Sequence, residues 1–328
     1  MNSTADRSEF NHNSAADFAI HPFHFLRHSN ACNLTLPKKD RPLLIIYVST
    51  GLRPADAEVR QLIRRTYASI AEQFKARVEF VVGMPRPQIQ KYASQFIEHQ
   101  FDAISTEAEQ YGDILQPNIV EGHGHLIYKW WAYAAYHGTR CRHVPHMIAT
   151  EQDVIIYIDR VMRWIRKRKR KLRGLVAACP MLFEKFSNPA VRRPHSKYLV
   201  SEKQWPLAML PEYCTGYFQL YTTETALALT KAVRELGIDY VTSWHPVHDT
   251  ATGIVAEVAG VKQVQMHGDG VKAYLPARNV CSLTYLGQHG LKDLRLYESL
   301  WALRLRCCND GRRTQIKNRT AESPVIKN

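Results

Sequence analysis

Short apolar runs alternate with longer amphipathic segments along residues 42–179, and this alternation limits the fold more than any other feature. Four runs have the length and continuous hydrophobicity of buried parallel strands: 42–50 (PLLIIYVST), 77–83 (RVEFVVG), 144–150 (VPHMIAT) and 174–179 (GLVAAC). Three segments between them have helical periodicity: 54–74, 86–100 and 125–137. The pattern predicts an α/β domain in which helices cover both faces of a mostly parallel, twisted sheet.

Polar, aperiodic sequence flanks this region. Residues 1–40 are rich in Asn, Ser and His and are expected to form a flexible stem, and residues 307–328 a loose basic tail, which leaves one domain at 41–306. With 328 residues, 45% of them hydrophobic, the chain can bury one large core. No apolar run approaches the roughly 20 residues of a membrane span, so we expect the chain to be soluble or to have lost an N-terminal anchor.

The chain is strongly basic, with a formal net charge of +14. Such a charge suits an anionic partner, whether nucleic acid, a membrane surface, a nucleotide or a sulfated glycan. Eight of the eleven residues of 163–173 (RWIRKRKRKLR) are Lys or Arg. This run is interpreted as the solvated end of a helix, a patch of the nuclear-localisation type, or a docking surface for an anionic acceptor. Since no aromatic residue follows Trp164 in the run, nucleic acid is the least favoured partner.

The seven cysteines have no CxxC spacing, which argues against structural zinc. Their odd number leaves at least one thiol unpaired or bonded to another chain, and their pairing does not follow from the sequence.

Two carboxylates stand where a predicted buried strand ends. In MIATEQDVIIYIDR (147–160), Glu151, Gln152 and Asp153 separate two apolar runs. A buried carboxylate is costly unless it is paired, hydrogen-bonded or bound to a metal. In open α/β sheets ligands bind beyond the carboxyl ends of the strands, which is where this cluster lies. Without further context, such a pair is more often a helix cap or a solvated turn than a metal site.

Six blocks, in order, resemble the β-1,3-galactosyltransferase and N-acetylglucosaminyltransferase family. They are EVRQLIRRTYAS (58–69), VEFVVG (78–83), EAEQYGDILQPNIVEGHGHLIYKWW (107–131), EQD (151–153), YLVSEKQWPLAMLPEYCTGYFQLY (198–221) and PVHDTATGIVAEVAGV (246–261). The resemblance implies a GT-A fold and an inverting, metal-dependent hexosyltransferase. It further implies a type II membrane protein of the Golgi that acts in protein glycosylation.

The resemblance assigns roles to particular residues. The acidic cluster takes the place of the family's D-D-D motif. The resemblance therefore implies that Asp153 binds a divalent metal, usually Mn²⁺ in the family, and that Glu151 lies near the ribose of the donor. His267, in VQMHGDG, is expected to be a further metal ligand. Asp249, in VHDTATG, takes the place of the family's catalytic base. The alternative for Asp249 is a structural role in its loop.

The same resemblance implies that Arg60, Arg64, Asp113 and Lys129 contact the nucleotide sugar. For the two arginines the alternative is ion pairing on a helix face. The expected donor is UDP-galactose or UDP-N-acetylglucosamine, and the expected acceptor is a glycan on a glycoprotein or glycolipid, joined through a β-1,3 linkage.

Glu151 and Gln152 replace two aspartates of the family motif. This departure leaves a rival hypothesis open: a non-catalytic relative that binds a glycan or a partner. The basic run leaves a second rival, a nucleic-acid-binding protein.

Overall fold

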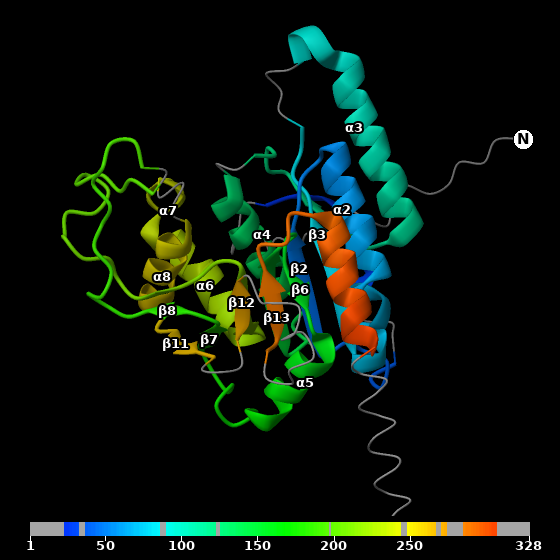
Figure 1. Ribbon diagram of the computed structural model, residues 1–328. Helices are drawn as coiled ribbons and strands as arrows, with labels where there is room; N and C mark the ends of the chain where they lie inside the picture. The colour runs from blue at the N-terminus through cyan, green and yellow to red at the C-terminus, as the bar shows by residue number, and fades with distance from the viewer. Residues whose placement is uncertain are drawn as a thin grey trace, which may run out of the picture.

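An eight-stranded sheet runs through the centre of the molecule (Figure 1). The computed structural model describes residues 23–32, 37–85, 90–122, 125–196, 198–243, 248–266, 270–273 and 285–306. The strands of the large sheet, in spatial order, are β1 (Phe25–Arg27), β4 (Ile114–Pro117), β3 (Ala76–Val81), β2 (Leu44–Ser49), β5 (His146–Glu151), β10 (Phe218–Thr222), β7 (Val176–Cys179) and β11 (Lys262–Gln265).

The sheet is mostly parallel, as the alternation of strands and helices predicts. β4, β3, β2 and β5 run parallel to one another, and so do β7 and β11. The antiparallel strand β10 lies between β5 and β7, and β1 pairs antiparallel with β4 at the edge. The four predicted apolar strands correspond to β2, β3, β5 and β7.

Helices cover both faces of the sheet. One face carries α2 (Pro54–Arg65), α3 (Gln90–Tyr111), α5 (Ile158–Lys167) and the helical residues 294–306, which lie beside α2 in Figure 1. The other face carries α4 (Leu126–Arg140), α6 (Thr223–Leu236) and α8 (His248–Val258), with the short α7 (Ile238–Thr242) next to them. The predicted helix at 54–74 ends as an α-helix at Arg65 and continues as two 3-10 turns, η2 (Tyr67–Ile70) and η3 (Glu72–Phe74).

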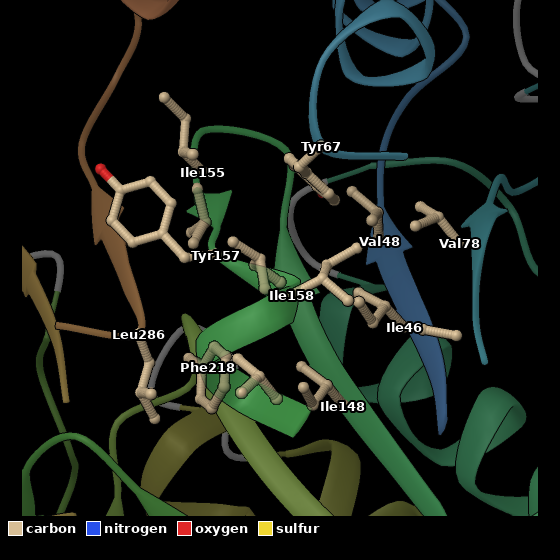
Figure 2. Close-up of a cluster of buried hydrophobic side chains, with 14 of the residues drawn as sticks. Ile46, Val48, Tyr67, Val78, Ile148, Ile155, Tyr157, Ile158, Phe218 and Leu286 are labelled. Atoms are coloured by element: carbon tan, nitrogen blue, oxygen red, sulfur yellow. The ribbon is translucent and has the colours of Figure 1, made fainter. Parts of the chain in front are cut away.

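The central strands are mostly apolar because both of their faces are buried. On β2, Ile46 and Val48 belong to the core cluster beneath α2 and α5, as Figure 2 shows, whereas Ile45 and Tyr47 point into the cluster beneath α4. Each fully buried side chain of this size contributes about 1.5–3 kcal/mol through removal of apolar surface from water. The alternation of side chains along the strand therefore divides the hydrophobic core into two layers.

Residues 23–32, assigned above to a flexible stem, are part of the folded domain. β1 pairs with β4, and Phe25 is buried against α4. A disulfide joins Cys32, in the 3-10 turn η1 (Asn30–Cys32), to Cys141 after α4. The packed domain thus begins before residue 41, because a covalent link and an edge strand fix this segment.

Two small sheets complete the fold. β6 (Ile155–Ile156), β13 (Gly287–His289) and β12 (Val271–Ala273) form one, and β8 (Leu182–Phe183) with β9 (Tyr213–Cys214) forms the other. A second disulfide, between Cys179 and Cys214, joins the end of β7 to β9. Within the part of the chain that the structure describes, every helix lacks the length or the apolar character needed to cross a bilayer.

Candidate functional site

A cavity of about 840 Å³ lies at the carboxyl ends of β2 and β5. Ser49 and Glu151, which end these two strands, are paired in register and both line it. The segment from Ser49 to Asp56 forms one wall, and Glu121, Lys129, His248 and Lys292 contribute to the others. The cavity therefore occupies the place where parallel α/β sheets bind their ligands.

Glu151 and Asp153, which line this cavity, lie close to His289. One ligand atom from each residue can be chosen so that all three atoms lie within 4.8 Å of one another. His289 Nε2 is 3.6 Å from Asp153 Oδ1 and 3.9 Å from Glu151 Oε2. The register of the small sheet explains this meeting, because β13 pairs antiparallel with β6 through Gln288 and Ile155. The next residue of β13 is thereby placed beside the residues that precede β6.

The electrostatics of this triad suit a divalent cation. Burial, together with the neighbouring Asp153 carboxylate, raises the pKa of Glu151 to about 7. Asp153 Oδ1 is buried and has no hydrogen-bond partner among the described residues, an arrangement that is costly for a carboxylate. Two carboxylates and an imidazole form a donor set of the kind that Mn²⁺, Zn²⁺ and related cations accept. These three residues could therefore hold a metal ion.

His289 is the site residue that the sequence analysis missed. The histidine ligand was expected to be His267, beside Asp153, and His267 lies outside the described residues. A lone histidine in LGQHG (286–290) carries no periodicity or spacing that marks a ligand. Only the pairing of β13 with β6 brings it to the acidic cluster.

Asp249, the second residue of α8, lies close enough to Glu151 to influence its charge. Its Oδ2 accepts a hydrogen bond from the backbone N–H of Gly216 at 3.0 Å. Its Oδ1 lies 3.0 Å from His248 Nε2 without the geometry of a hydrogen bond, and the His248 ring lines the cavity. A Cβ at residue 216 would come within 2.3 Å of Asp249 Oδ1, so glycine is needed for this close approach.

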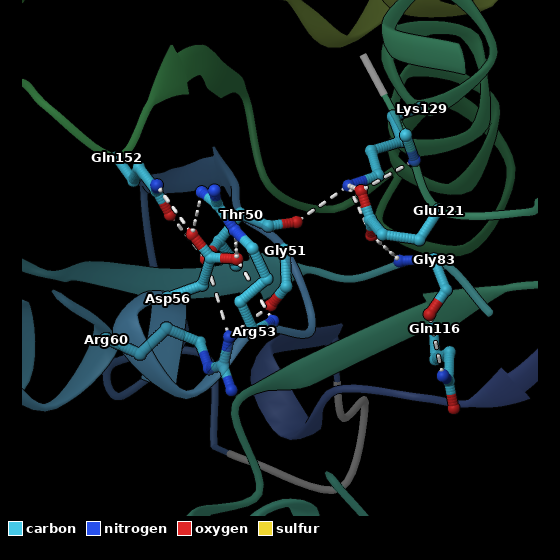
Figure 3. A network of polar contacts seen from close by, with 11 residues as sticks. Thr50, Gly51, Arg53, Asp56, Arg60, Gly83, Gln116, Glu121, Lys129 and Gln152 are labelled. Carbon is cyan, nitrogen blue, oxygen red and sulfur yellow. Dashed lines mark hydrogen bonds and ion pairs between the residues drawn. The ribbon is translucent and has the colours of Figure 1, made fainter. Parts of the chain in front are cut away.

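Gln152 connects the acidic cluster to the wall of the cavity (Figure 3). Thr50 Oγ1 donates to its side-chain carbonyl at 2.7 Å, and its amide Nε2 donates to Asp56 Oδ1 at 3.0 Å. Arg53 holds the same carboxylate through Nε and NH2, each at 2.9 Å. Burial alone would raise the pKa of Asp56, but hydrogen bonds from Arg53 and Gln152 hold it below its usual range. Both the carbonyl and the amide group of the Gln152 side chain are thus hydrogen-bonded.

Lys129 lines the cavity from α4, but its ammonium is already engaged (Figure 3). Nζ donates to the carbonyl of Thr50 at 2.6 Å and to both carboxylate oxygens of Glu121 at 2.7 Å. Burial lowers the pKa of Lys129, and the Glu121 carboxylate counteracts this effect. Glu121 also accepts from the backbone N–H of Gly83. The pair therefore ties together the loops that follow β2, β3 and β4.

Three of the predicted nucleotide-binding residues do not line the cavity: Arg60, Arg64 and Asp113. Arg60 binds Glu107 through two hydrogen bonds and donates to the carbonyl of Gly51 at 2.6 Å. Arg64 forms a bidentate pair with Asp113, at 2.8 and 2.7 Å, and a further ion pair with Glu107. This geometry matches the alternative of ion pairing, and direct contact of these residues with a nucleotide stays a prediction.

Comparison with known proteins gives consistent matches. Residues 58–267 match the family model described as Galactosyltransferase. Human acetylgalactosaminyl-O-glycosyl-glycoprotein beta-1,3-N-acetylglucosaminyltransferase is 27% identical over 210 residues, covering 63% of this chain and 51% of the relative. Human lactosylceramide 1,3-N-acetyl-beta-D-glucosaminyltransferase is 22% identical over 269 residues, covering 79% of this chain and 65% of the relative.

Beta-1,3-galactosyltransferase 5 of Pan paniscus is 21% identical over 164 residues, covering 50% of this chain and 51% of that protein. The chain thus spans between half and two thirds of the length of these curated relatives. Among solved structures, mouse xyloside xylosyltransferase 1 in its apo form aligns with a TM-score of 0.36 at 10% identity, covering 76% of this chain and 97% of that one.

Proposed function

Since the chain belongs to the galactosyltransferase family, we propose that it is an inverting, metal-dependent transferase that moves a hexose from a UDP-sugar to a hydroxyl group of a glycan. The donor is UDP-galactose or UDP-N-acetylglucosamine, the linkage is β-1,3, and the domain has the GT-A architecture. The observation that carries this proposal is the meeting of Glu151, Asp153 and His289 at the carboxyl edge of the sheet.

The triad provides the place for the diphosphate of the donor. A divalent cation, Mn²⁺ in this proposal, would offset the charge that develops on the UDP leaving group when it is bound there. Asp153 and His289 would hold the cation directly, and Glu151 would lie near the ribose of the donor. Lys292, which lines the cavity close to Glu151, adds a positive charge on the side of the phosphates.

Asp249 is the proposed general base. An inverting transfer needs a group that takes the proton of the acceptor hydroxyl on the face opposite the leaving group. The N–H of Gly216 orients the Asp249 carboxylate. His248, whose Nε2 is 3.0 Å from Asp249 Oδ1, lines the cavity. The alternative base is His248 itself, with Asp249 orienting its ring. Both residues would act in the same proton-transfer step, so a comparison of one variant at each position identifies the base.

The rival function is a non-catalytic relative whose acidic motif no longer supports turnover. The replacement of an aspartate by Gln152 favours it, because the motif loses a negative charge. Against it stands the hydrogen bonding of Gln152 to Thr50 and Asp56. Gln152 therefore has a structural role at the cavity wall, which is expected of an altered motif that still functions.

The proposed compartment is the Golgi lumen. Two disulfides, Cys32–Cys141 and Cys179–Cys214, support it, since such bonds persist in oxidising compartments and are rare in the cytosol. The second disulfide ends two residues before Gly216 and so braces the loop that orients Asp249.

A donor screen tests the proposal. The purified protein, with Mn²⁺, a panel of UDP-sugars and glycan acceptors ending in galactose or N-acetylgalactosamine, should release UDP with one of the donors and form a β-linked product. The matched control is Asp153→Ala, which should lose this activity. Absence of product with every donor, in a protein that still binds UDP in a Mn²⁺-dependent manner, would favour the non-catalytic rival.

A further inference from the structure

The basic run at 163–173 forms a concave surface of its own. It begins in the last turns of α5 and continues through the turn residues that lead to β7. A hollow of about 650 Å³ is lined there entirely by cationic residues: Arg166, Lys167, Arg168, Lys169, Arg170, Lys171 and Arg173. We call these seven residues the basic hollow.

The apolar residues of the run anchor the basic hollow to the core. Trp164, Ile165 and Leu172 are buried in the cluster beneath α5. Arg168 lies over the ring of Trp164, with its guanidinium carbon 4.7 Å from the ring centroid. The charged side chains on either side of these anchors are mostly exposed. The cations therefore project from a fixed backbone, which reduces the entropy lost when they bind a ligand.

The run carries more positive charges than the acidic side chains around it pair with. A helix C-terminus favours one or two positive charges in its last turn. Within the described ranges, Lys167, Lys169, Arg170 and Lys171 form no ion pair with an acidic side chain. Bringing so many like charges together is unfavourable, and a polyanion would relieve the repulsion.

The basic hollow lies at the end of the sheet opposite the candidate active site. Thr222 pairs with His146 at the start of β5, and its hydroxyl donates to the carbonyl of Gly174 just after the run. Glu151 is at the other end of β5, about 17 Å away at the usual rise per residue of a strand. Figure 1 shows α5 at the bottom of the molecule and the beginning of α2, which follows β2 at the site, near the top. The hollow is therefore separate from the cavity that would take the donor.

We propose that the basic hollow binds a sulfated polysaccharide, which docks there while the reaction site at the opposite edge stays free. A planar guanidinium group can donate two parallel hydrogen bonds to two oxygens of a sulfate group, as it does to a phosphate group. A chain of regularly spaced sulfates meets several of the clustered cations at once.

Two other polyanions fit less well. Single-stranded nucleic acid needs exposed aromatic rings for base stacking, and the one aromatic residue of the run, Trp164, is buried. The disulfides moreover indicate a compartment without nucleic acid. A membrane surface would favour exposed apolar residues that insert among the headgroups, and the three apolar residues of the run face the core.

Heparin serves as the probe. The test variant carries Lys167→Gln, Lys169→Gln, Arg170→Gln and Lys171→Gln. The matched control carries Lys38→Gln, Lys39→Gln, Lys203→Gln and Lys231→Gln, four exposed cations outside the hollow with the same total charge change. Heparin affinity at 0.15 M salt is measured by surface plasmon resonance, and Mn²⁺-dependent UDP binding reports whether each variant is folded.

We expect the test variant to bind heparin about tenfold or more weakly, with a shallower salt dependence because fewer counterions are released. The control variant should stay within about twofold of the wild type. Desulfated heparin, duplex DNA and vesicles containing phosphatidylserine should all bind more weakly than heparin. An equal loss in both variants would overturn the proposal, and so would tighter binding to the DNA or to the vesicles than to heparin.

Discussion

The imidazole ring of His289 lies flat against the phenol ring of Tyr217, with centroids 4.2 Å apart and planes inclined by 3°. Tyr217 precedes β10 in the large sheet, whereas His289 ends β13 in the small one. The Tyr217 hydroxyl also reaches the carbonyl of Val271 on β12, at 3.5 Å. The stack therefore restrains the plane of the imidazole, whose Nε2 lies 3.6 Å from Asp153 Oδ1.

Removal of this stack should weaken metal binding. An aromatic pair is worth about 0.5–1.5 kcal/mol beyond its buried area, so Tyr217→Leu should lower Mn²⁺ affinity about 2- to 10-fold. Tyr217→Phe keeps the ring and should bind Mn²⁺ like the wild type. Isothermal titration at saturating UDP measures both. Equal affinities of the Leu and Phe variants would show that the stack does not position His289.

Asp249→Asn should reduce glycosyl transfer by about 100-fold or more, the usual loss when a general base is removed. The amide keeps the shape of the side chain, so UDP binding and the thermal midpoint should stay near those of the wild type. His248→Gln is the comparison and should cost much less. If His248→Gln instead abolishes transfer while Asp249→Asn leaves most of it, the base has been assigned to the wrong residue of the pair.

Gln152→Glu should destabilise the site for two reasons. The new carboxylate would lie beside that of Asp56, and Asp56 would lose the amide N–H of Gln152 that now donates to it at 3.0 Å. We expect the free energy of unfolding to fall by about 1–3 kcal/mol, the cost of a buried polar group that loses its partner. Asp56→Asn in the same chain should recover part of the loss, and urea unfolding of both single variants and the double variant measures the coupling. Full additivity would mean that Gln152 and Asp56 do not interact.

Glu79 should make stability fall as the pH rises. Burial, followed by the nearby Asp113 carboxylate, raises the pKa of Glu79 well above its usual range. The folded protein therefore keeps a proton that the unfolded chain releases above about pH 4.5. The stability that this proton provides is present below that pH and is lost as the pH rises toward the folded pKa, by about 1.4 kcal/mol per unit.

Glu79→Gln removes this dependence, so the variant should match the wild type near pH 5 and exceed it in stability at pH 7.5. The exposed Glu58→Gln is the matched control and should follow the wild type at both values. Parallel urea-unfolding profiles for the Glu79 variant and the wild type would show that Glu79 is charged in the folded protein.

The acidic cluster could be placed from the sequence because the run MIAT is followed by Glu151, Gln152 and Asp153. A strand that is buried on both faces can be recognised from such a continuous run of mostly apolar residues. His289 could not be placed, since its strand has three residues and its position depends on a pairing with β6, more than 130 residues earlier in the chain.

The partners of charged residues were equally hidden. Arg64 belongs to a recognisable block, but its pairing with Asp113 and Glu107 depends on the packing of α2 against the end of α3. Segment 23–32 reads as part of a polar stem because its order comes from a disulfide and from an edge pairing with β4. In each case the missing information is a contact between residues far apart in the chain.

The most direct test of the central claim is the titration of UDP into the wild-type protein, Asp153→Ala and His289→Ala, each with Mn²⁺ and with EDTA. If Asp153 and His289 hold the cation that carries the diphosphate, the wild type should bind UDP at least about tenfold more tightly with Mn²⁺, a difference of about 1.4 kcal/mol. Both variants should lose this gain and keep the weak binding seen in EDTA. An undiminished Mn²⁺ effect in either variant would contradict the account.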